Sequence, residues 1–127
     1  MARLEHVNFT VADPDATAAE LCALFDWQVR WAGPGMTTGR TVHVGGADSY
    51  VALFSYGGVQ AAAPDSYRTV GGMNHLAVVV DDLDATEARV KAAGYVPINH
   101  ADYEPGRRFY FRERNGVEIE VVSYSTN

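Results

Sequence analysis

The sequence predicts an α+β fold built from two copies of one β-α-β-β-β module, and three observations support this class. Residues 6–17 (HVNFTVADPDAT) align without a gap with residues 75–86 (HLAVVVDDLDAT), and six of the twelve positions are identical. Each copy passes from strand-like alternation into a helical pattern. With 127 residues, 47% of them hydrophobic, the chain can bury a core without disulfides. Two copies of so long a repeat indicate a duplicated supersecondary unit, because a solenoid usually needs at least three repeats.

Both copies open with a strand that leads into a helix. Apolar and polar residues alternate over residues 6–11, which is typical of a half-buried strand. The Asp-Pro pair at 13–14 predicts a helix start, because Asp is a favoured N-cap and Pro a favoured first helical residue. In the second copy Asp82 is the expected N-cap, and Gly94 is the residue expected just after the helix end.

Further short strands complete each module. In the first copy we predict them around residues 41–44 and 50–56, and in the second around 95–98, 108–112 and 117–123. The stretch 57–72, which contains Gly, Ala, Pro and Ser, is predicted to be a linker with some ordered contacts. We therefore expect a single domain over residues 1–127, with the first module at about 1–60, the linker at about 57–72 and the second module at about 73–127.

Composition narrows the class of partner. The formal net charge of −6 provides no basic surface for nucleic acid or anionic lipid. No apolar run approaches the roughly 18 residues of a membrane span, and the N-terminus lacks the apolar core of a signal peptide. Cys22 is the only cysteine and cannot pair within the chain, which fits a reducing compartment. We expect a cytoplasmic protein that binds a small molecule and neither nucleic acid nor a membrane.

Four side chains that could bind a metal fall on equivalent faces of the predicted sheets. Strand alternation places His6 and His75 on the face opposite the helix of each copy. The same alternation places Glu118 and Glu120 on that face of the last strand. Two imidazoles and one carboxylate form a 2-His-1-carboxylate set, which leaves coordination positions open for a substrate on a divalent ion such as Fe, Mn or Zn.

The motifs at 6–15 (HVNFTVADPD), 75–82 (HLAVVVDD) and 108–121 (RFYFRERNGVEIEV) resemble the vicinal oxygen chelate superfamily. This superfamily includes glyoxalase I, extradiol dioxygenases, fosfomycin-modifying thiol transferases, methylmalonyl-CoA epimerase and the bleomycin-resistance proteins. The resemblance covers essentially the whole chain. It implies paired modules that form an open barrel around a divalent metal, Fe, Mn, Zn or Ni, and it implies a homodimer.

The same resemblance implies a ligand set. It assigns the metal ligands to His6, His75 and Glu120, and prefers Glu120 because the family's carboxylate lies four residues after the glycine of the terminal turn, here Gly116. We expect Glu118 nearer the rim and the solvent. In the implied dimer, His6 of one chain would lie beside His75 and Glu120 of the partner subunit.

One departure from the family pattern bears on the reaction. Four-ligand members such as glyoxalase I carry a carboxylate in the first module, and its counterpart in this chain is Ala52. Three-ligand members, the extradiol dioxygenases and thiol transferases, are therefore the closer models. Tyr110 matches the position of the extradiol enzymes' active-site tyrosine, so Tyr110 and Glu118 are the candidate acid/base residues. The candidate substrate pocket consists of Asn8, Tyr50, Ala52, Phe54 and Tyr56.

A metal-free binding protein of the bleomycin-resistance type is the alternative. Such a protein would sequester a small molecule or antibiotic in a dimer groove lined by aromatic side chains, here Trp31, Tyr56 and Tyr103. Proteins of that type usually lack the metal triad. Its presence in this chain favours the enzyme.

Overall fold

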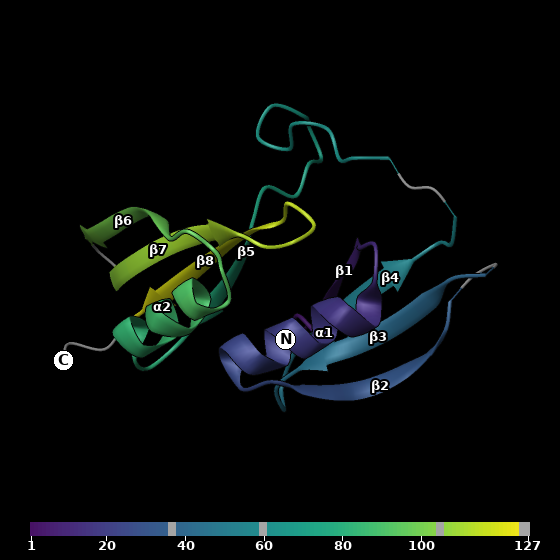
Figure 1. The fold of residues 1–127 in the computed structure, drawn as a ribbon, viewed down its shortest axis with the longest axis horizontal. Coiled ribbons are helices and arrows are strands. Elements are labelled where there is room, and N and C mark those ends of the chain that lie inside the picture. The colour runs from purple at the N-terminus through teal and green to yellow at the C-terminus, as the bar shows by residue number, and fades with distance from the viewer. Residues whose placement is uncertain (36–37, 59–60, 104–105, 125–127) are drawn as a thin grey trace. The chain divides into compact units, whose positions relative to one another are not determined.

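The computed structural model describes residues 1–35, 38–58, 61–103 and 106–124, with the side chain of Tyr103 left out. The chain divides into two compact units, Met1–Ala61 and Ala62–Asn127. Each unit contains one module in the order β-α-β-β-β (Figure 1). The predicted α+β class and the duplicated module are therefore confirmed.

The first module forms a four-stranded mixed sheet with one helix. Its elements are β1 (His6–Thr10), α1 (Pro14–Phe25), β2 (Gln28–Pro34), β3 (Arg40–Gly45) and β4 (Tyr50–Ser55). The strand order is β1-β4-β3-β2. Strand β1 runs parallel to β4, whereas the other neighbours are antiparallel. In the described residues this sheet stays open, with β1 and β2 at its edges.

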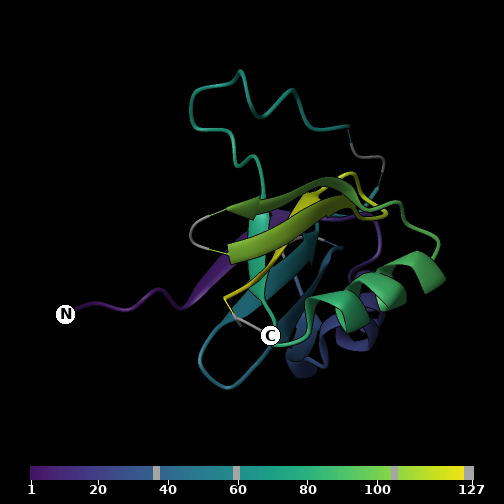
Figure 2. The same cartoon turned by 90° about the vertical axis from the view of Figure 1, so that its left-hand side faces the viewer.

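The second module repeats this topology. Its elements are β5 (Leu76–Val79), α2 (Leu83–Ala92), β6 (Ile98–Tyr103), β7 (Gly106–Arg112) and β8 (Glu118–Ser123). The strand order is β5-β8-β7-β6, and again only the first pair is parallel. In both modules the helix lies across one face of its own sheet (Figures 1 and 2).

Both helices begin where the sequence predicts, and α2 also ends where it predicts. The carboxylate of Asp13 accepts a hydrogen bond from the amide of Ala16, and Asp82 accepts one from Ala85 in the same way. These bonds satisfy amides that have no partner inside a first turn. Gly94 follows α2 with φ of 96°, a left-handed conformation that glycine adopts without steric cost.

Apolar side chains between helix and sheet form the core of each module. In the first module the core includes Ala18, Leu21, Leu24, Val42, Val44, Val51 and Leu53. In the second it includes Leu83, Val90, Phe109, Phe111, Ile119 and Val121. In each module the opposite face of the sheet carries the side chains that could bind a ligand or take part in catalysis.

Strand register makes corresponding positions of the two modules explicit. Asn8 of β1 lies opposite Ala52 of β4, and Ala77 of β5 lies opposite Glu120 of β8. Asn8 and Ala77 are equivalent in the sequence repeat. Ala52 therefore occupies in the first module the position that Glu120 occupies in the second, as the sequence alignment predicts.

Two strands differ from the sequence prediction. Strand β2 was not located by its sequence, because six of its seven residues are exposed at a sheet edge and show no apolar alternation. The strand predicted around 95–98 was wrong in position, since β6 begins only at Ile98. Gly94 and Pro97 delay its start, because Pro97 has no N–H to donate to a strand ladder and Gly94 has a positive φ that departs from strand conformation.

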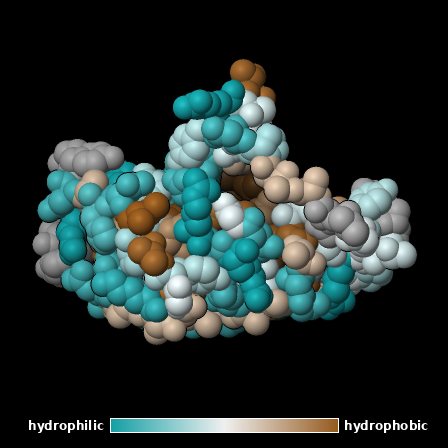
Figure 3. All heavy atoms as spheres, turned by 45° about the horizontal axis from the view of Figure 1, so that its top comes forward, coloured by the Kyte–Doolittle hydropathy of each residue, from teal (hydrophilic) through white to brown (hydrophobic). Residues whose placement is uncertain are grey.

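In the described part of the chain, no helix is long and apolar enough to cross a membrane. The face drawn in Figure 3 is mainly hydrophilic, with hydrophobic side chains in separate patches.

Candidate metal and substrate site

The open face of the second sheet brings together a histidine and a buried carboxylate. His75 lies immediately before β5, and Glu120 lies in the middle of the neighbouring strand β8. Nε2 of His75 is 3.1 Å from Oε1 of Glu120, and Glu120 is only 6% exposed. Glu120 pairs with Ala77 in the parallel β5–β8 register, and His75, two residues before Ala77, lies on the same face.

An arginine binds the second oxygen of the same carboxylate. Nη1 of Arg108, on β7, donates to Oε2 of Glu120 over 2.8 Å. The side chains of both residues are about nine-tenths buried, at 11% and 9% exposure. Nε and Nη2 of Arg108 also donate to the carbonyl of Gly106, each over 3.2 Å. The carboxylate is thus held between an imidazole and a guanidinium.

Tyr110 belongs to the same face. It pairs with Glu120 across β7 and β8, and its ring centroid lies 5.8 Å from that of His75 in an edge-on arrangement. Since cross-strand partners project from the same side of a sheet, the Tyr110 ring lies beside the His75 and Glu120 pair.

Glu118 does not lie near the solvent, and the prediction that it does was wrong. It is 8% exposed, because Tyr67 and Arg112 cover it. The Tyr67 hydroxyl donates to Oε1 of Glu118 over 2.6 Å, and Nη2 of Arg112 donates to Oε2 over 3.3 Å. The hydrogen bond to Glu118 and partial burial raise the pKa of Tyr67 to about 12, so the phenol stays protonated at neutral pH.

Two residues of this face, Arg108 and Tyr67, were not predicted from the sequence. Arg108 precedes Tyr110 by two residues on β7, so strand alternation puts both on one face and could have pointed to Arg108. Tyr67 lies in the linker, in a turn stabilised by hydrogen bonds to Asp65. No periodic pattern in the sequence indicates that Tyr67 contacts Glu118, which lies 51 residues later in the chain.

One ring nitrogen of His75 lacks a partner among the described residues. Its Nδ1 is buried and forms no hydrogen bond with any of them, whereas its Nε2 lies beside Glu120. Buried polar atoms are nearly always paired, and an exception often marks a missing ion or water. Imidazole nitrogen and carboxylate oxygen are also the donor types that Zn, Mn and Fe accept. His75 and Glu120 therefore supply donor atoms of the types that suit two ligand positions of a divalent-metal site.

The first module carries rings where the second carries charges. His6 stacks on Tyr50 with centroids 4.8 Å apart, and Tyr50 stacks on His43 at 4.6 Å. Nδ1 of His6 and the Tyr50 hydroxyl both bind Oε1 of Glu5, at 2.9 and 3.1 Å. These bonds lower the pKa of Glu5, and partial burial followed by the charge of His6 lowers the pKa of His43. The guanidinium of Arg30 covers the Tyr50 ring at 4.6 Å.

The residues predicted to line a substrate pocket follow one face of β1 and β4. Asn8 and Ala52 are direct neighbours, and Ala52 is 1% exposed. Phe54 and Tyr56 contact each other edge to face, with centroids 6.2 Å apart. Of the aromatic residues expected in a binding groove, Trp31 packs against His43 and is half exposed, whereas the Tyr103 side chain lies outside the described residues.

Three protein ligands do not converge in any described part of the chain. Among the described residues, no group of three His, Cys, Asp or Glu side chains is placed to hold one metal ion. His75 and Glu120 belong to the second unit and His6 to the first.

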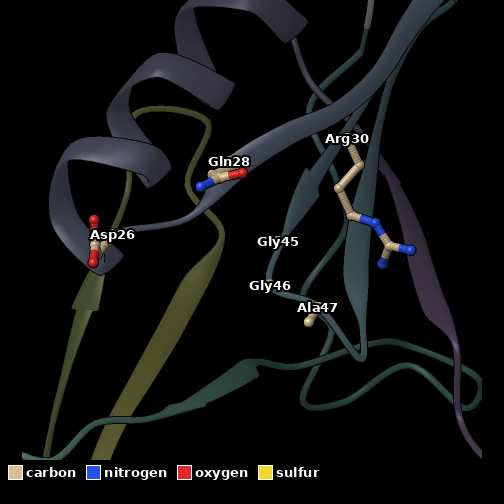
Figure 4. A pocket seen from close by; sticks show the side chains of 6 residues that line it. All are labelled: Asp26, Gln28, Arg30, Gly45, Gly46 and Ala47. Atoms are coloured by element: carbon tan, nitrogen blue, oxygen red, sulfur yellow. The ribbon is translucent and has the colours of Figure 1, made fainter.

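A shallow hollow in the first module is lined by other residues. It has a volume of about 380 Å³ and lies between the end of α1 and the β3–β4 turn (Figure 4). It is lined by Asp26, Gln28, Arg30, Gly45, Gly46 and Ala47. Figure 4 shows that the wall from Gly45 to Ala47 carries no large side chain. None of the candidate catalytic or metal-binding residues lines it.

Solved structures share this fold over nearly their whole length. A glyoxylase/bleomycin resistance protein/dioxygenase domain from Frankia sp. EAN1pec is 24% identical, with a TM-score of 0.82 and coverage of 97% of this chain and 98% of that one. FosX from Listeria monocytogenes, a fosfomycin resistance protein solved with Mn(II) and sulfate, is 18% identical, with a TM-score of 0.73 and coverage of 99% and 95%. TioX from Micromonospora sp. ML1 is 21% identical, with a TM-score of 0.69 and coverage of 97% and 99%.

Sequence comparison identifies the family directly. A search of curated protein sequences gave no significant match. The family model of the Glyoxalase/Bleomycin resistance protein/Dioxygenase superfamily, by contrast, matches residues 3–121, which is most of the chain. The repeated module, its strand order and this match agree, and the chain belongs to the Glyoxalase/Bleomycin resistance protein/Dioxygenase superfamily.

Proposed function

We propose that this protein is a divalent-metal-dependent enzyme that acts on a small molecule with two adjacent oxygen atoms. His75 and Glu120 are two of the metal's ligands in this proposal. The observation that carries it is the 3.1 Å approach of His75 Nε2 to a buried carboxylate on the open face of the second sheet. Two metal-binding side chains in contact are stronger support than either histidine or carboxylate alone.

The chemistry of such an ion is that of a Lewis acid, which polarises a substrate oxygen and leaves positions open for that substrate. Mn(II) is the first ion to test, because the FosX structure that this chain resembles holds it. The ligand set is closest to that of extradiol dioxygenases or thiol transferases, since Ala52 stands where a fourth ligand would come from.

The residues around this pair would position and protonate a substrate. Glu118 is buried and accepts a 2.6 Å hydrogen bond from the Tyr67 hydroxyl, so in this proposal the two residues act as a proton-transfer pair for general acid/base catalysis. Tyr110 lies beside His75 and opposite Glu120, where its hydroxyl is the other candidate donor. Asn8 and the aromatic residues of the first sheet are the proposed substrate contacts.

His6 is the proposed third ligand, and the protein is proposed to be a homodimer. This rests on the sequence repeat, which makes His6 the counterpart of His75. If the site combines two chains, a mixture of a His6→Ala chain with a Glu120→Ala chain should regain metal binding in the heterodimer. Full retention of metal by His6→Ala alone would remove His6 from the ligand set.

A metal-free binding protein is the second candidate, and one observation favours it. The buried charge of Glu120 is already balanced by Arg108, so the second module does not need a metal for charge neutrality. In that case the exposed rings of the first sheet, Trp31 and Tyr56, would hold a planar ligand.

Metal titration separates the two functions. Isothermal titration of the metal-free protein with Mn(II) and Zn(II) should give about one ion per site in the wild type. His75→Ala and Glu120→Gln should weaken binding by roughly 100-fold or more, since each removes a ligand. His100→Ala is the matched control, because His100 is exposed and paired with Glu87 on α2. Equal binding in all four proteins would rule out this site, and absence of binding in the wild type would favour the metal-free candidate.

A further inference from the structure

The contact between Arg108 and Glu120 has a role that the metal proposal alone does not explain. A guanidinium in direct contact with a proposed ligand competes with any cation that approaches the same oxygen. Arg108 takes Oε2 at 2.8 Å, while His75 faces Oε1 at 3.1 Å. Both oxygens of the carboxylate are therefore already engaged inside the second module.

The guanidinium is fixed from two sides. Besides Glu120, it donates through Nε and Nη2 to the carbonyl of Gly106 at the start of β7. That backbone lies close against β8, since a Cβ at Gly106 would collide with the Ser123 carbonyl oxygen. A side chain anchored in this way loses little further entropy when it binds the carboxylate.

The equivalent positions of the first module lack both partners of this pair. Arg108 lies opposite Val122 in the β7–β8 register, as Thr41 lies opposite Phe54 in the β3–β4 register. Thr41 is therefore the counterpart of Arg108, as Ala52 is the counterpart of Glu120. The arginine is present in the module that has the buried carboxylate, and is absent from the module that lacks it.

Burial explains why the two residues belong together. A carboxylate with 9% of its side chain exposed needs a positive partner, because an unpaired buried charge is strongly destabilising. Arginine keeps its proton at every physiological pH, so its charge is permanent. Arg108 thus supplies in the metal-free protein the charge that a bound ion would otherwise supply.

We propose that Arg108 is a resident counter-ion that stands in for the metal, keeps the second module folded without it, and lowers metal affinity by competing for Glu120. This inference rests on the proposed function. It predicts that the protein is folded both with and without the metal, so that the fraction of protein with bound metal follows the free metal concentration. An arginine that only orients Glu120 for the metal would have the opposite effect, because loss of such a residue weakens metal binding by roughly 10–100-fold.

Arg108→Gln is the decisive variant, with Mn(II) titration and urea unfolding of the metal-free protein as the two measurements. We expect Mn(II) affinity to rise by roughly tenfold or more and the metal-free protein to unfold at lower urea concentration. Arg107→Gln is the matched control, because Arg107 is the adjacent residue and forms an exposed ion pair with Asp84. Its Mn(II) affinity should equal that of the wild type. Arg108→Lys covers the case in which Arg108→Gln does not fold: it keeps the charge without the planar fork, and should bind Mn(II) more tightly than wild type by a smaller factor.

The outcomes separate this inference from the proposed function. Unchanged or weaker Mn(II) binding in Arg108→Gln, or in Arg108→Lys if only that variant folds, with normal binding in the wild type would overturn the competition and leave the metal site intact. No Mn(II) or Zn(II) binding in the wild type, Arg108→Gln or Arg108→Lys would overturn both. Tighter binding combined with lower metal-free stability, and with an unaffected Arg107→Gln control, would support the counter-ion role.

Discussion

The two modules share one backbone plan and differ in the chemistry of their open faces. In the first, stacked rings of His6, Tyr50 and His43 cover the sheet. In the second, a buried carboxylate, Glu120, lies between an imidazole and a guanidinium. Identical strand order and equivalent register show that the difference does not come from the fold. A few side chains at fixed register positions decide whether a sheet of this kind can offer metal ligands.

The largest expected effect comes from placing the carboxylate of the second module in the first. Ala52→Glu would bury a charge at a site that is 1% exposed and has Thr41 where the second module has arginine. We expect the free energy of unfolding to fall by about 3–5 kcal/mol, as for a buried charge that has lost its partner. Urea denaturation measures this, with Ala52→Gln as the control for added volume.

The double variant Ala52→Glu/Thr41→Arg then tests whether the carboxylate and the arginine contribute to stability as a pair. If register equivalence is correct, the new arginine should reach the new carboxylate and restore stability with a coupling energy of about 1–3 kcal/mol. Additive losses in the double variant would show that the two sheets are not equivalent at these positions.

A second expected difference concerns the hairpin turns. Glu113 is buried and its carboxylate accepts bonds from the amides of Asn115 and Val117 and from the Asn115 side chain. The β3–β4 turn has Gly45 instead at the end of β3. Glu113→Ala should lower the free energy of unfolding by about 2 kcal/mol, because three part-buried donors lose their acceptor. Thermal unfolding, with the exposed neighbour Arg114→Ala as control, would show it, and equal melting temperatures would contradict it.

The helix caps should behave alike in both modules. Asp13 and Asp82 each accept a bond from the amide three residues on, at 3.2 and 3.0 Å. Asp13→Ala and Asp82→Ala should each lower the free energy of unfolding by about 1 kcal/mol. A clear effect of only one substitution in urea denaturation would mean that the two helices do not contribute equally to the folded state.

The smallest effect on stability is expected for the Tyr67 and Glu118 hydrogen bond. Because it favours the protonated phenol, its contribution is complete below the ordinary tyrosine pKa of 10.0 and is lost as pH rises to about 12. Tyr67 is 55% exposed, so solvent screens this contribution. Absorbance titration of tyrosinate should show one tyrosine fewer at about pH 12 in Tyr67→Phe, and Glu118→Gln should move that tyrosine toward 10.0. An unchanged titration in both variants would contradict the contact.

Much of the fold could be predicted from the sequence because the repeat and its periodicities are local signals. The caps at Asp13 and Asp82 and the strand alternation are both read from neighbouring residues. Strand β2 could not be found in this way, because its exposed edge position leaves no apolar pattern. Its place is set by pairing with β3, a contact that the sequence does not specify locally.

The candidate site, like the fold, could be predicted only where neighbouring residues carry the signal. Alternation places His75 and Glu120 on one face, and the structure has their side chains in contact. The Arg108 contact depends on how far a long side chain reaches diagonally across two strands, which alternation does not give. Tyr67 comes from a linker without periodicity, and its bond to Glu118 buries a residue that the sequence suggests is near the solvent.

The most direct test of the metal site is the broadening of histidine ring signals by paramagnetic Mn(II) in NMR spectra. The chain has only four histidines, so each ring can be assigned by substitution. At substoichiometric Mn(II), the His75 ring signals should broaden strongly, and this broadening should disappear in Glu120→Gln, while the exposed His100 ring stays sharp in both proteins. Sharp His75 signals at a Mn(II) level that broadens His100 would contradict the assignment of His75 and Glu120 as metal ligands.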